Sequence, residues 1–264
     1  MNNFENKTIW LTGASSGIGE ELCIQLAKQG ARLILSSRNV TALEIVKSRL
    51  KDPEKHRVVA IDLEKSGEIE GIVQAVMKEI KTVHYLFNNG GLSQRSKAID
   101  TSLAIDRKIM EINYFGNIAM TKAILPYMLA QKEGHIIAIS SISGKFGFFL
   151  RSAYSASKHA LHGFYESLLL EEEGNGINVT IVCPGKISTN ISVNALTGTG
   201  EKHGAMDNNQ ATGMPVEECV QQLLKAVAKK KKEVLIGNKE IKAVTIKRFF
   251  PALFWRIIKK QSAV

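Results

Sequence analysis

Tyr154 and Lys158 are the two residues whose types and spacing most clearly suggest acid–base chemistry, because they lie four positions apart. In a helix, side chains at this spacing share one face, one turn apart. An adjacent ammonium group favours the phenolate and lowers the pKa of a tyrosine from its ordinary value of about 10. The pair therefore predicts a proton-transfer device, although a surface tyrosine beside a solvated lysine gives the same pattern.

A glycine-rich turn is the second feature with chemical meaning. Gly13, Gly17 and Gly19 lie between a β-prone run, Thr8–Leu11, and an amphipathic stretch, Glu20–Gln29. Glycines let the backbone approach a pyrophosphate, and a helix amino terminus presents free N–H groups to it. The arrangement strand, turn, helix therefore predicts a dinucleotide-phosphate site.

The end of the next predicted strand, Arg32–Ser36, bears on the choice of dinucleotide. Folds that select NAD usually place an acid at this point to hold the ribose 2′-hydroxyl. Here Ser37 and Arg38 follow the strand and no acid is present. A serine followed by an arginine suits the 2′-phosphate of NADP, although Arg38 could also be an ordinary loop cation.

Strands and helices alternate along residues 1–240, which predicts an α/β fold with a single domain. We expect a Rossmann fold: a doubly wound parallel sheet of seven strands with helices on both faces. Leu103–Leu129 is predicted as one long helix that contains Asn113 and is interrupted near Pro126. The remaining predicted strands are Arg57–Ile61, Val83–Phe87, His135–Ser140, Asn178–Cys183 and Glu233–Gly237; the remaining predicted helices are Val40–Leu50, Glu68–Lys81, a helix from the Tyr154 segment through Glu173, and Pro215–Ala228.

Two segments stand apart from this alternation. Ser188–Met214 is long and polar, which is typical of a substrate loop or lid. The tail, residues 241–264, mixes aromatic and basic side chains, and Pro251 is placed to begin a helix. This tail fits a helix lying on a membrane surface, and equally a segment packed on the core or on another subunit.

Composition and charge limit the class of protein. The chain of 264 residues is 44% hydrophobic and has a formal net charge of +10, which suggests an anionic partner. Cys23, Cys183 and Cys219 are odd in number and lack metal-ligand spacing, so we predict reduced, buried thiols and no metal. No signal peptide or membrane-spanning run is evident, so we expect a cytoplasmic protein, with peripheral membrane contact through the tail as an alternative.

Taken together and in order, these motifs resemble the short-chain dehydrogenase/reductase family over residues 7–237. The resemblance rests on the glycine turn, on Asp62, on Asn88–Gly91, on Asn113, on Ser141, on Tyr154 with Lys158, and on Pro184-Gly185 with Thr189. The step of thirteen residues from Ser141 to Tyr154 is the family's spacing. A further likeness is to the membrane-associated branch that reduces lipophilic carbonyls such as steroids, retinoids and acyl-dihydroxyacetone phosphate.

The resemblance implies roles for individual residues. Tyr154 would be the general acid/base, Lys158 would lower its pKa and bind the nicotinamide ribose, Ser141 would bind the substrate oxygen, and Asn113 would hold a relay water. The implied cofactor-binding residues are Gly13, Ser15, Ser16, Gly17, Ile18, Gly19, Ser37, Arg38, Asp62, Leu63, Asn89, Gly90, Tyr154, Lys158, Pro184, Gly185, Ile187 and Thr189. Two positions depart from the family: Gly90 replaces its usual alanine, which should loosen that turn, and Ser16 is not basic.

We therefore predict an NADP(H)-dependent oxidoreductase that interconverts a carbonyl and an alcohol, on a small and lipophilic substrate. One alternative is a 3-oxoacyl-thioester reductase of fatty-acid synthesis, whose acidic carrier would suit the positive charge. Another is a non-catalytic nucleotide-binding scaffold at membranes. The family also implies a homo-oligomer, a dimer or tetramer, paired through the helices that contain Asn113 and Tyr154. No motif for nucleic acid is present.

Overall fold

The computed structural model describes residues 4–261, and within them the chain forms one parallel sheet of seven strands. The strand order is β3-β2-β1-β4-β5-β6-β7, which is the doubly wound Rossmann arrangement predicted from the sequence. The strands are β1 Thr8–Thr12, β2 Arg32–Ser37, β3 Arg57–Ala60, β4 Tyr85–Asn88, β5 Gly134–Ile139, β6 Ile177–Pro184 and β7 Glu233–Ile236.

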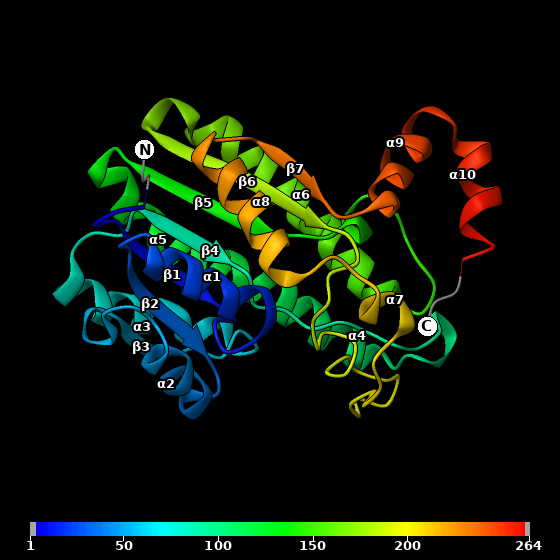
Figure 1. Cartoon of the computed structure of the whole chain (residues 1–264), viewed down its shortest axis with the longest axis horizontal. Coiled ribbons are helices and arrows are strands. Elements are labelled where there is room, and N and C mark those ends of the chain that lie inside the picture. The colour runs from blue at the N-terminus through cyan, green and yellow to red at the C-terminus, as the bar shows by residue number, and fades with distance from the viewer. Residues whose placement is uncertain (1–3, 262–264) are drawn as a thin grey trace.

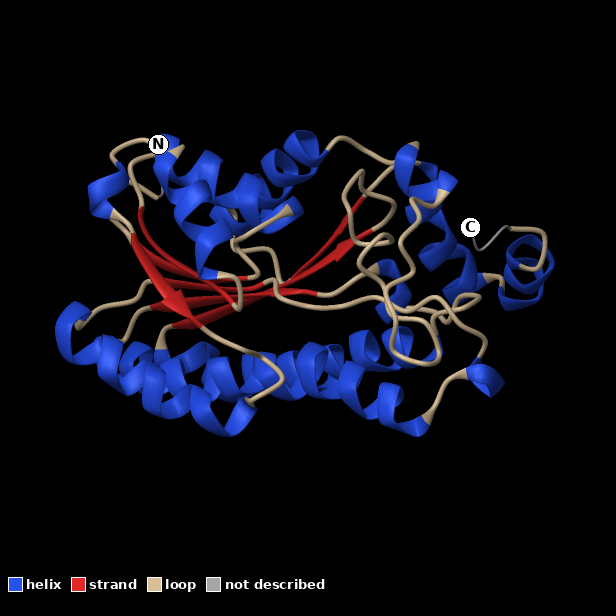
Figure 2. Ribbon diagram, turned by 90° about the horizontal axis from the view of Figure 1, so that it is seen from below, coloured by secondary structure: helices blue, strands red, loops and turns tan. Residues whose placement is uncertain are grey.

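Helices cover both faces of the sheet, so that the strands lie between two helical layers (Figure 2). The main helices are α1 Gly17–Lys28, α2 Val40–Ser48, α3 Ser66–Ile80, α4 Leu103–Met110, α5 Gly116–Gln131, α6 Ser152–Glu172 and α8 Val216–Ala228. Buried residues of α1, α2 and α8 form one core with the sheet, and those of α3, α5 and α6 form the other. Because both faces are covered, the central strands are apolar along almost their whole length, as in β5, where every residue is buried.

The region predicted as one long helix differs in where its irregularity falls. α4 continues through a π-helical turn, Glu111–Phe115, into α5, and the chain stays helical past Pro126 to Gln131. The predicted interruption near Pro126 is therefore wrong. Proline costs a helix one hydrogen bond, but Ile124 and Met128 are fully buried on either side of it and hold the helix in place. The irregular turn is centred on Asn113 instead.

Two segments gather beyond the carboxyl ends of the strands. The predicted loop at residues 188–214 is mostly irregular but includes one short helix, α7 Asn208–Ala211. The tail forms α9 Lys242–Phe249 and α10 Pro251–Ile258, which project at the same end of the molecule as α7 (Figure 1). Pro251 begins a helix, as predicted, and residues 262–264 of the tail lie outside the described residues.

The tail packs on the body along one face only. Phe254 and Ile258 are buried in a small core with Phe146, and the rings of Phe254 and Phe146 are 5.2 Å apart. Trp255, in contrast, is 53% exposed. Packing on the core, one of the two predicted arrangements, is therefore present for part of the tail, and Ala243, Val244 and Ile246 of α9 also pack against this small core. No helix within residues 4–261 is long and apolar enough to cross a bilayer.

Candidate active site

A cavity of about 1110 Å³ lies at the carboxyl ends of the strands and extends to the tail. Almost every residue predicted for the site lines it. The lining includes Gly13, Ser15, Ser16, Gly17, Ile18, Ser37, Arg38, Asp62, Leu63, Asn89, Gly90, Ser141, Tyr154, Lys158, Pro184, Gly185, Ile187 and Thr189. Of the predicted residues, Gly19 and Asn113 do not line the cavity.

The glycine turn, residues 12–19, forms one wall of this cavity. Gly13 and Gly17 have φ angles of +65° and +57°, a conformation that favours glycine. Asn89 fastens the turn, since its Nδ2 donates to the carbonyl oxygens of Thr12 at 3.2 Å and Gly13 at 3.1 Å. The side chain of Ser16, at the amino terminus of α1, makes no cap bond to the helix. Exposed backbone and free helical N–H groups fit the pyrophosphate of a dinucleotide.

Gly19 lies behind this wall and acts through packing. A Cβ atom there would collide with the carbonyl oxygen of Gly13 and would lie 2.6 Å from Asn89 Nδ2, so only glycine lets the turn close. Gly90, the departure from the family, has a related explanation. A Cβ on Gly90 would collide with the side chain of Leu63. Leu63 thus fills the space that an alanine methyl would take, and the turn is not left loose.

Ser37 and Arg38 lie at the end of β2, on the cavity wall where the sequence places a 2′-phosphate site. The Ser37 Oγ accepts a hydrogen bond from Asn39 N at 3.2 Å, which fixes the start of α2. Arg38 is exposed, and no carboxylate within residues 4–261 forms an ion pair with it. Its guanidinium is therefore available to an anionic ligand.

Tyr154 is buried in the first turn of α6, 8% exposed, and lines the cavity together with Ser141. Burial raises the pKa of Tyr154 above its ordinary value, because a phenolate is poorly solvated there. The side chain of Ser141 and the charges of Arg151 and Arg95 favour the phenolate and lower the pKa of Tyr154 in part. Burial thus favours the neutral phenol of Tyr154 over the phenolate.

Lys158 shares the face of α6 with Tyr154, as the spacing predicts, and among the described contacts its ammonium bonds a backbone carbonyl and not the phenol. Lys158 Nζ donates to the carbonyl oxygen of Ile139 at 2.8 Å and lies 5.8 Å from the centre of the Tyr154 ring. The expected lowering of the tyrosine pKa by Lys158 is therefore wrong for this structure, where burial dominates. Burial also lowers the pKa of Lys158 to about 8, since the charged form has lost its water.

Asn113 is fully buried in the π-helical turn between α4 and α5. Its Oδ1 accepts from Leu92 N at 2.7 Å, and its Nδ2 donates to Leu92 O at 2.9 Å and to Ser157 Oγ at 3.0 Å. A Cβ atom built on Gly91 would lie 3.0 Å from Asn113 Oδ1 and 3.6 Å from Lys158 Nζ. Asn113 thus ties α6 to the segment after β4 and lies beside Lys158, behind the cavity wall.

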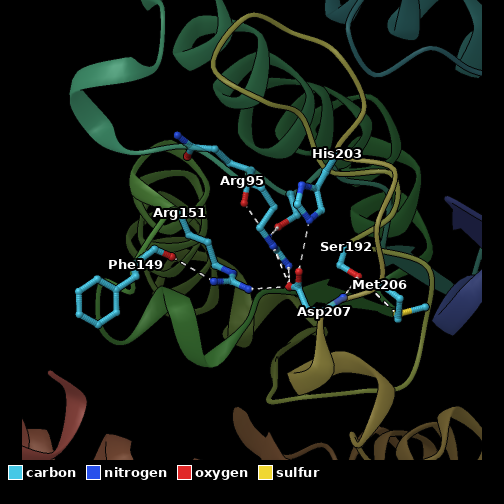
Figure 3. A network of polar contacts seen from close by, with 9 residues as sticks. Arg95, Phe149, Arg151, Ser192, His203, Met206 and Asp207 are labelled. Carbon is cyan, nitrogen blue, oxygen red and sulfur yellow. Dashed lines mark hydrogen bonds and ion pairs between the residues drawn. The ribbon is translucent and has the colours of Figure 1, made fainter. Parts of the chain in front are cut away.

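Sequence reasoning missed an ion cluster formed by Arg95, Arg151 and Asp207, here called the arginine cluster (Figure 3). Asp207 Oδ2 accepts from Arg95 Nε at 2.8 Å and from Arg151 Nη2 at 3.1 Å. The side chain of Asp207 is fully buried and that of Arg95 is 2% exposed. Arg95 and Asp207 are 112 positions apart, and neither belongs to a local motif, so no sequence signal could have paired them.

A possible metal-binding group also lacked a sequence signal. The fold brings His162, Cys183 and Glu233 together, with ligand atoms within 4.8 Å of one another. Lys145 already pairs with the Glu233 carboxylate, and burial lowers the pKa of His162 to about 4 while raising that of Cys183 to about 12. These neutral buried groups are accounted for by packing and by the bond of His162 to Ser140 at 3.1 Å.

Known proteins agree with this architecture. Among solved structures, a short-chain dehydrogenase/reductase from Burkholderia phymatum in complex with NAD has a TM-score of 0.83 at 21% identity, covering 96% of each chain. An actinorhodin polyketide ketoreductase with NADPH has a TM-score of 0.66 at 33% identity, covering 70% of this chain and 72% of the other.

Curated proteins are similar over nearly the whole sequence. Dehydrogenase/reductase SDR family member 7B of Mus musculus is 44% identical, over 97% of this chain and 81% of its own. Dehydrogenase/reductase SDR family protein 7-like of Anopheles gambiae is 39% identical, over 98% of this chain and 84% of its own. The family model for short chain dehydrogenase matches residues 7–199, and the chain belongs to the short-chain dehydrogenase/reductase family of oxidoreductases.

Proposed function

We propose that this chain transfers a hydride between NADP(H) and the carbonyl or alcohol group of a lipophilic substrate. The observation that carries the proposal is that the buried Tyr154 lines the cavity together with Ser141, with Lys158 one turn further along α6. The relatives support a redox reaction, and the ketoreductase structure holds NADPH. A scaffold that only binds nucleotides has no need of this buried pair.

The side chains have complementary tasks in this proposal. A bound nicotinamide would supply or accept the hydride. Tyr154 donates its phenolic proton to the alkoxide oxygen that forms when a carbonyl is reduced. Ser141 donates a hydrogen bond to the same oxygen and so stabilises its developing charge. Lys158 is close enough to return a proton to Tyr154 by way of a ribose hydroxyl or a water, and its lowered pKa suits that exchange.

The replacement Tyr154→Phe tests this proposal, because it removes the acidic hydroxyl and keeps the ring. We expect kcat for reduction of a good ketone substrate to fall by about 10³-fold, while NADPH still binds. Tyr85→Phe is the matched control, since Tyr85 is half-buried in β4 and does not line the cavity. Turnover by Tyr154→Phe near the wild-type rate, measured as NADPH oxidation, would show that Tyr154 is not the acid.

Preference for NADP over NAD is the second part of the proposal, and it rests on Ser37 and Arg38. We expect the wild-type chain to bind NADPH at least about tenfold more tightly than NADH, because a guanidinium binds a phosphate by paired charged hydrogen bonds. Arg38→Ala should remove that difference and leave NADH binding unchanged. Equal affinities in the wild-type chain would contradict the role of Arg38 and leave the reaction class standing.

The lipophilic character of the substrate is supported by the far wall of the cavity, which includes Phe146, Phe148, Ile246 and Ile257. The adjoining tail carries an outward apolar surface with basic residues beside it. Phe249, Phe250, Leu253, Trp255 and Ile257 are 39–65% exposed. Aromatic and basic side chains on one short helical segment are typical of contact with anionic lipid. We therefore propose that the tail holds the cavity mouth against a membrane.

Co-sedimentation with anionic vesicles tests the tail. We expect Phe250→Ser with Trp255→Ser to weaken vesicle binding by about tenfold or more, since each exposed aromatic side chain contributes burial in lipid. Both residues are exposed, so the body keeps its packing. Ile45→Ser is the control, because Ile45 is 56% exposed on α2. Equal sedimentation of the wild-type chain and the double variant would exclude this membrane contact.

A homo-oligomer paired through the helices containing Asn113 and Tyr154 stays part of the proposal. Those helical segments expose large apolar side chains: Leu103 at 60%, Phe115 at 45% and Leu170 at 81%. Sedimentation of wild type and of Phe115→Asp would test the pairing. We expect the wild-type chain to be dimeric or larger and the variant to dissociate.

A further inference from the structure

The chain that follows β6, residues 184–189, joins two parts of the cavity and is here called the bridging segment. Most of its residues line the cavity: Pro184, Gly185, Lys186, Ile187 and Thr189. At one end, Ser141 Oγ donates to the carbonyl oxygen of Pro184 at 3.4 Å. At the other end, a Cβ atom built on Gly17 would lie 3.4 Å from the side chain of Thr189. The bridging segment therefore runs from the proposed site of reaction to the glycine turn.

A dinucleotide would lie along the bridging segment. Its pyrophosphate fits the glycine turn, and its reactive ring belongs beside Tyr154, so the part between them passes this backbone. The ring of a nicotinamide carries a carboxamide, which both donates and accepts hydrogen bonds and so pairs well with backbone N–H and C=O groups. A backbone offers such groups at fixed places only when it is held, because an unsupported loop loses conformational freedom when a ligand binds. The supports of the bridging segment therefore decide how well the ring is positioned.

Two neighbouring segments hold the bridging segment by backbone bonds. Gly185 N donates to the carbonyl oxygen of Ile236 in β7 at 2.7 Å. Met214 N donates to Lys186 O at 2.8 Å, and Ser188 N donates to Met214 O at 2.9 Å. The N–H group of Lys186 lies between these bonds, and it donates to a side chain.

That side chain is Glu240, which immediately precedes the tail. Its Oε1 accepts from Lys186 N at 2.9 Å and from Asn238 N at 3.1 Å. A Cβ atom on Gly185 or on Gly237 would collide with the same oxygen, so these two glycines leave the space in which the carboxylate lies. Glu240 is half-buried and itself lines the cavity. A backbone N–H group that donates to a carboxylate makes a charge-assisted bond, which is stronger than a bond between neutral groups.

We propose that Glu240 is a positioning residue for the nicotinamide half of NADP(H). It fixes the backbone of Lys186, and through it the bridging segment, in the conformation against which the ring binds. Glu240 acts through this backbone and takes no part in proton transfer. No local motif marks the role, because Glu240 and Lys186 are 54 positions apart. The inference rests on the proposed reductase function and adds to it a residue outside the motifs that predicted the site.

Two ligands that differ by the reduced nicotinamide ring provide the experiment: NADPH, and 2′-phosphoadenosine diphosphoribose, which lacks the ring. Calorimetric titration measures both affinities without turnover. We expect the wild-type chain to bind NADPH more tightly than the fragment by about tenfold or more. Glu240→Ala should remove most of that difference and leave the affinity for the fragment unchanged. Glu240→Gln should retain the difference, because its amide oxygen can accept the same backbone bonds.

Lys247→Met is the matched control. Lys247 joins the tail to the body by a different contact, since its Nζ donates to the carbonyl oxygen of Lys145 at 2.8 Å. Its replacement should leave both affinities unchanged. In ketone reduction at saturating NADPH, Glu240→Ala should lower kcat by about tenfold, because a misplaced ring seldom reaches the geometry for hydride transfer. Thermal unfolding of each variant shows whether it is folded.

The outcomes separate this inference from the proposed function. Equal losses of affinity for NADPH and for the fragment in Glu240→Ala overturn the inference, because a general loss of structure affects both ligands. Unchanged affinity for both also overturns it, as does a wild-type chain that binds the two ligands equally. Ketone reduction by the wild-type chain in any of these cases leaves the reductase standing. A ring contribution that is lost in Glu240→Ala, in a chain that reduces no ketone, supports the positioning role and overturns the reductase.

Discussion

The glycine turn and the arginine cluster line the same cavity but are built in different ways. The turn is short, local and neutral, and its contacts join backbone atoms to the side chains of Asn89 and Thr12. The cluster is made of charged side chains from three distant segments that meet around Asp207. An added side-chain atom should destabilise the turn, because a Cβ at Gly19 would collide with the Gly13 carbonyl. Removal of a charged group should destabilise the cluster, because its members are held by ion pairs. This contrast leads to different expectations for substitutions in the two regions.

The largest effect is expected at the centre of the cluster. Asp207→Asn leaves two buried guanidinium groups without a counter-charge, so we expect the free energy of unfolding to fall by roughly 3–5 kcal/mol. Asp52→Asn is the control for the same change at the surface, where an ion pair with Lys55 at 2.7 Å is solvated. Its cost should stay within about 1 kcal/mol. Urea unfolding measures both.

A double variant makes that test more specific. If excess positive charge is the cause, Asp207→Asn combined with Arg151→Met should be more stable than Asp207→Asn alone, because one of the two cations is gone. An equal loss of unfolding free energy in Asp207→Asn and Asp52→Asn would mean that the cluster contributes no more to stability than a surface ion pair. The proposed difference between the cluster and the glycine turn would then be wrong.

The glycine turn should respond to a single added methyl group. Gly19→Ala forces a Cβ against the Gly13 carbonyl, and we expect a loss of about 1–3 kcal/mol in unfolding free energy. NADPH affinity, measured by fluorescence titration, should fall at the same time by about tenfold or more. Gly71→Ala on α3 is the control, since a Cβ there meets nothing within 4 Å. It should gain up to about 1 kcal/mol, and equal behaviour of the two variants would contradict the steric account.

Replacement of Lys158 should change the unfolding free energy by less, and in the opposite direction. Its folded pKa of about 8 lies below the ordinary 10.5, so at pH 7 the ammonium is charged in both states and the folded state carries the full desolvation cost. Lys158→Met should therefore raise the unfolding free energy at pH 7 by about 2 kcal/mol while it removes activity.

The pH dependence of that difference is the critical measurement. As the pH rises from about 8 toward 10.5, the folded wild-type chain loses the proton first and recovers stability, so the gap to Lys158→Met should narrow through this range and close only above pH 10.5. Lys239→Met serves as the control, because Lys239 is exposed. A gap that stays constant with pH would mean that side-chain packing, not the buried charge, separates the two proteins.

The same contrast explains how much could be predicted from the sequence. The glycine turn, the alternation of strands and helices, and the pairing of Tyr154 with Lys158 depend on residues close together in the chain, and local pattern is enough to find them. The course of the helix through Pro126 was missed because tertiary packing outweighed a local cost. The proton affinity of Tyr154 was missed because it depends on burial, which spacing does not report.

The arginine cluster could not be predicted from local sequence patterns, for a different reason. Arg95 and Asp207 lie in segments without helical or strand periodicity, and their partnership exists only once the substrate loop folds over the sheet. What the sequence did reveal was the charge excess of the whole chain and an unusually long polar loop. In the structure, several basic residues and part of the polar loop line the same cavity.

The π-helical turn at residues 111–115 has a consequence for insertions and deletions in this gene. A turn of this kind holds one residue more than the α-helix around it. Loss of a single codon within it would therefore restore a regular α-helix and leave α4 and α5 facing as they do now, whereas the same loss inside α4 would rotate one part of that helix by about 100°. Ile105 and Ile109, which are buried on α4, would keep their places in the core when the deletion falls in the turn. The fold would thus tolerate a deletion at residues 111–115, but Asn113 lies at the centre of the turn, so the same deletion would displace the asparagine beside Lys158.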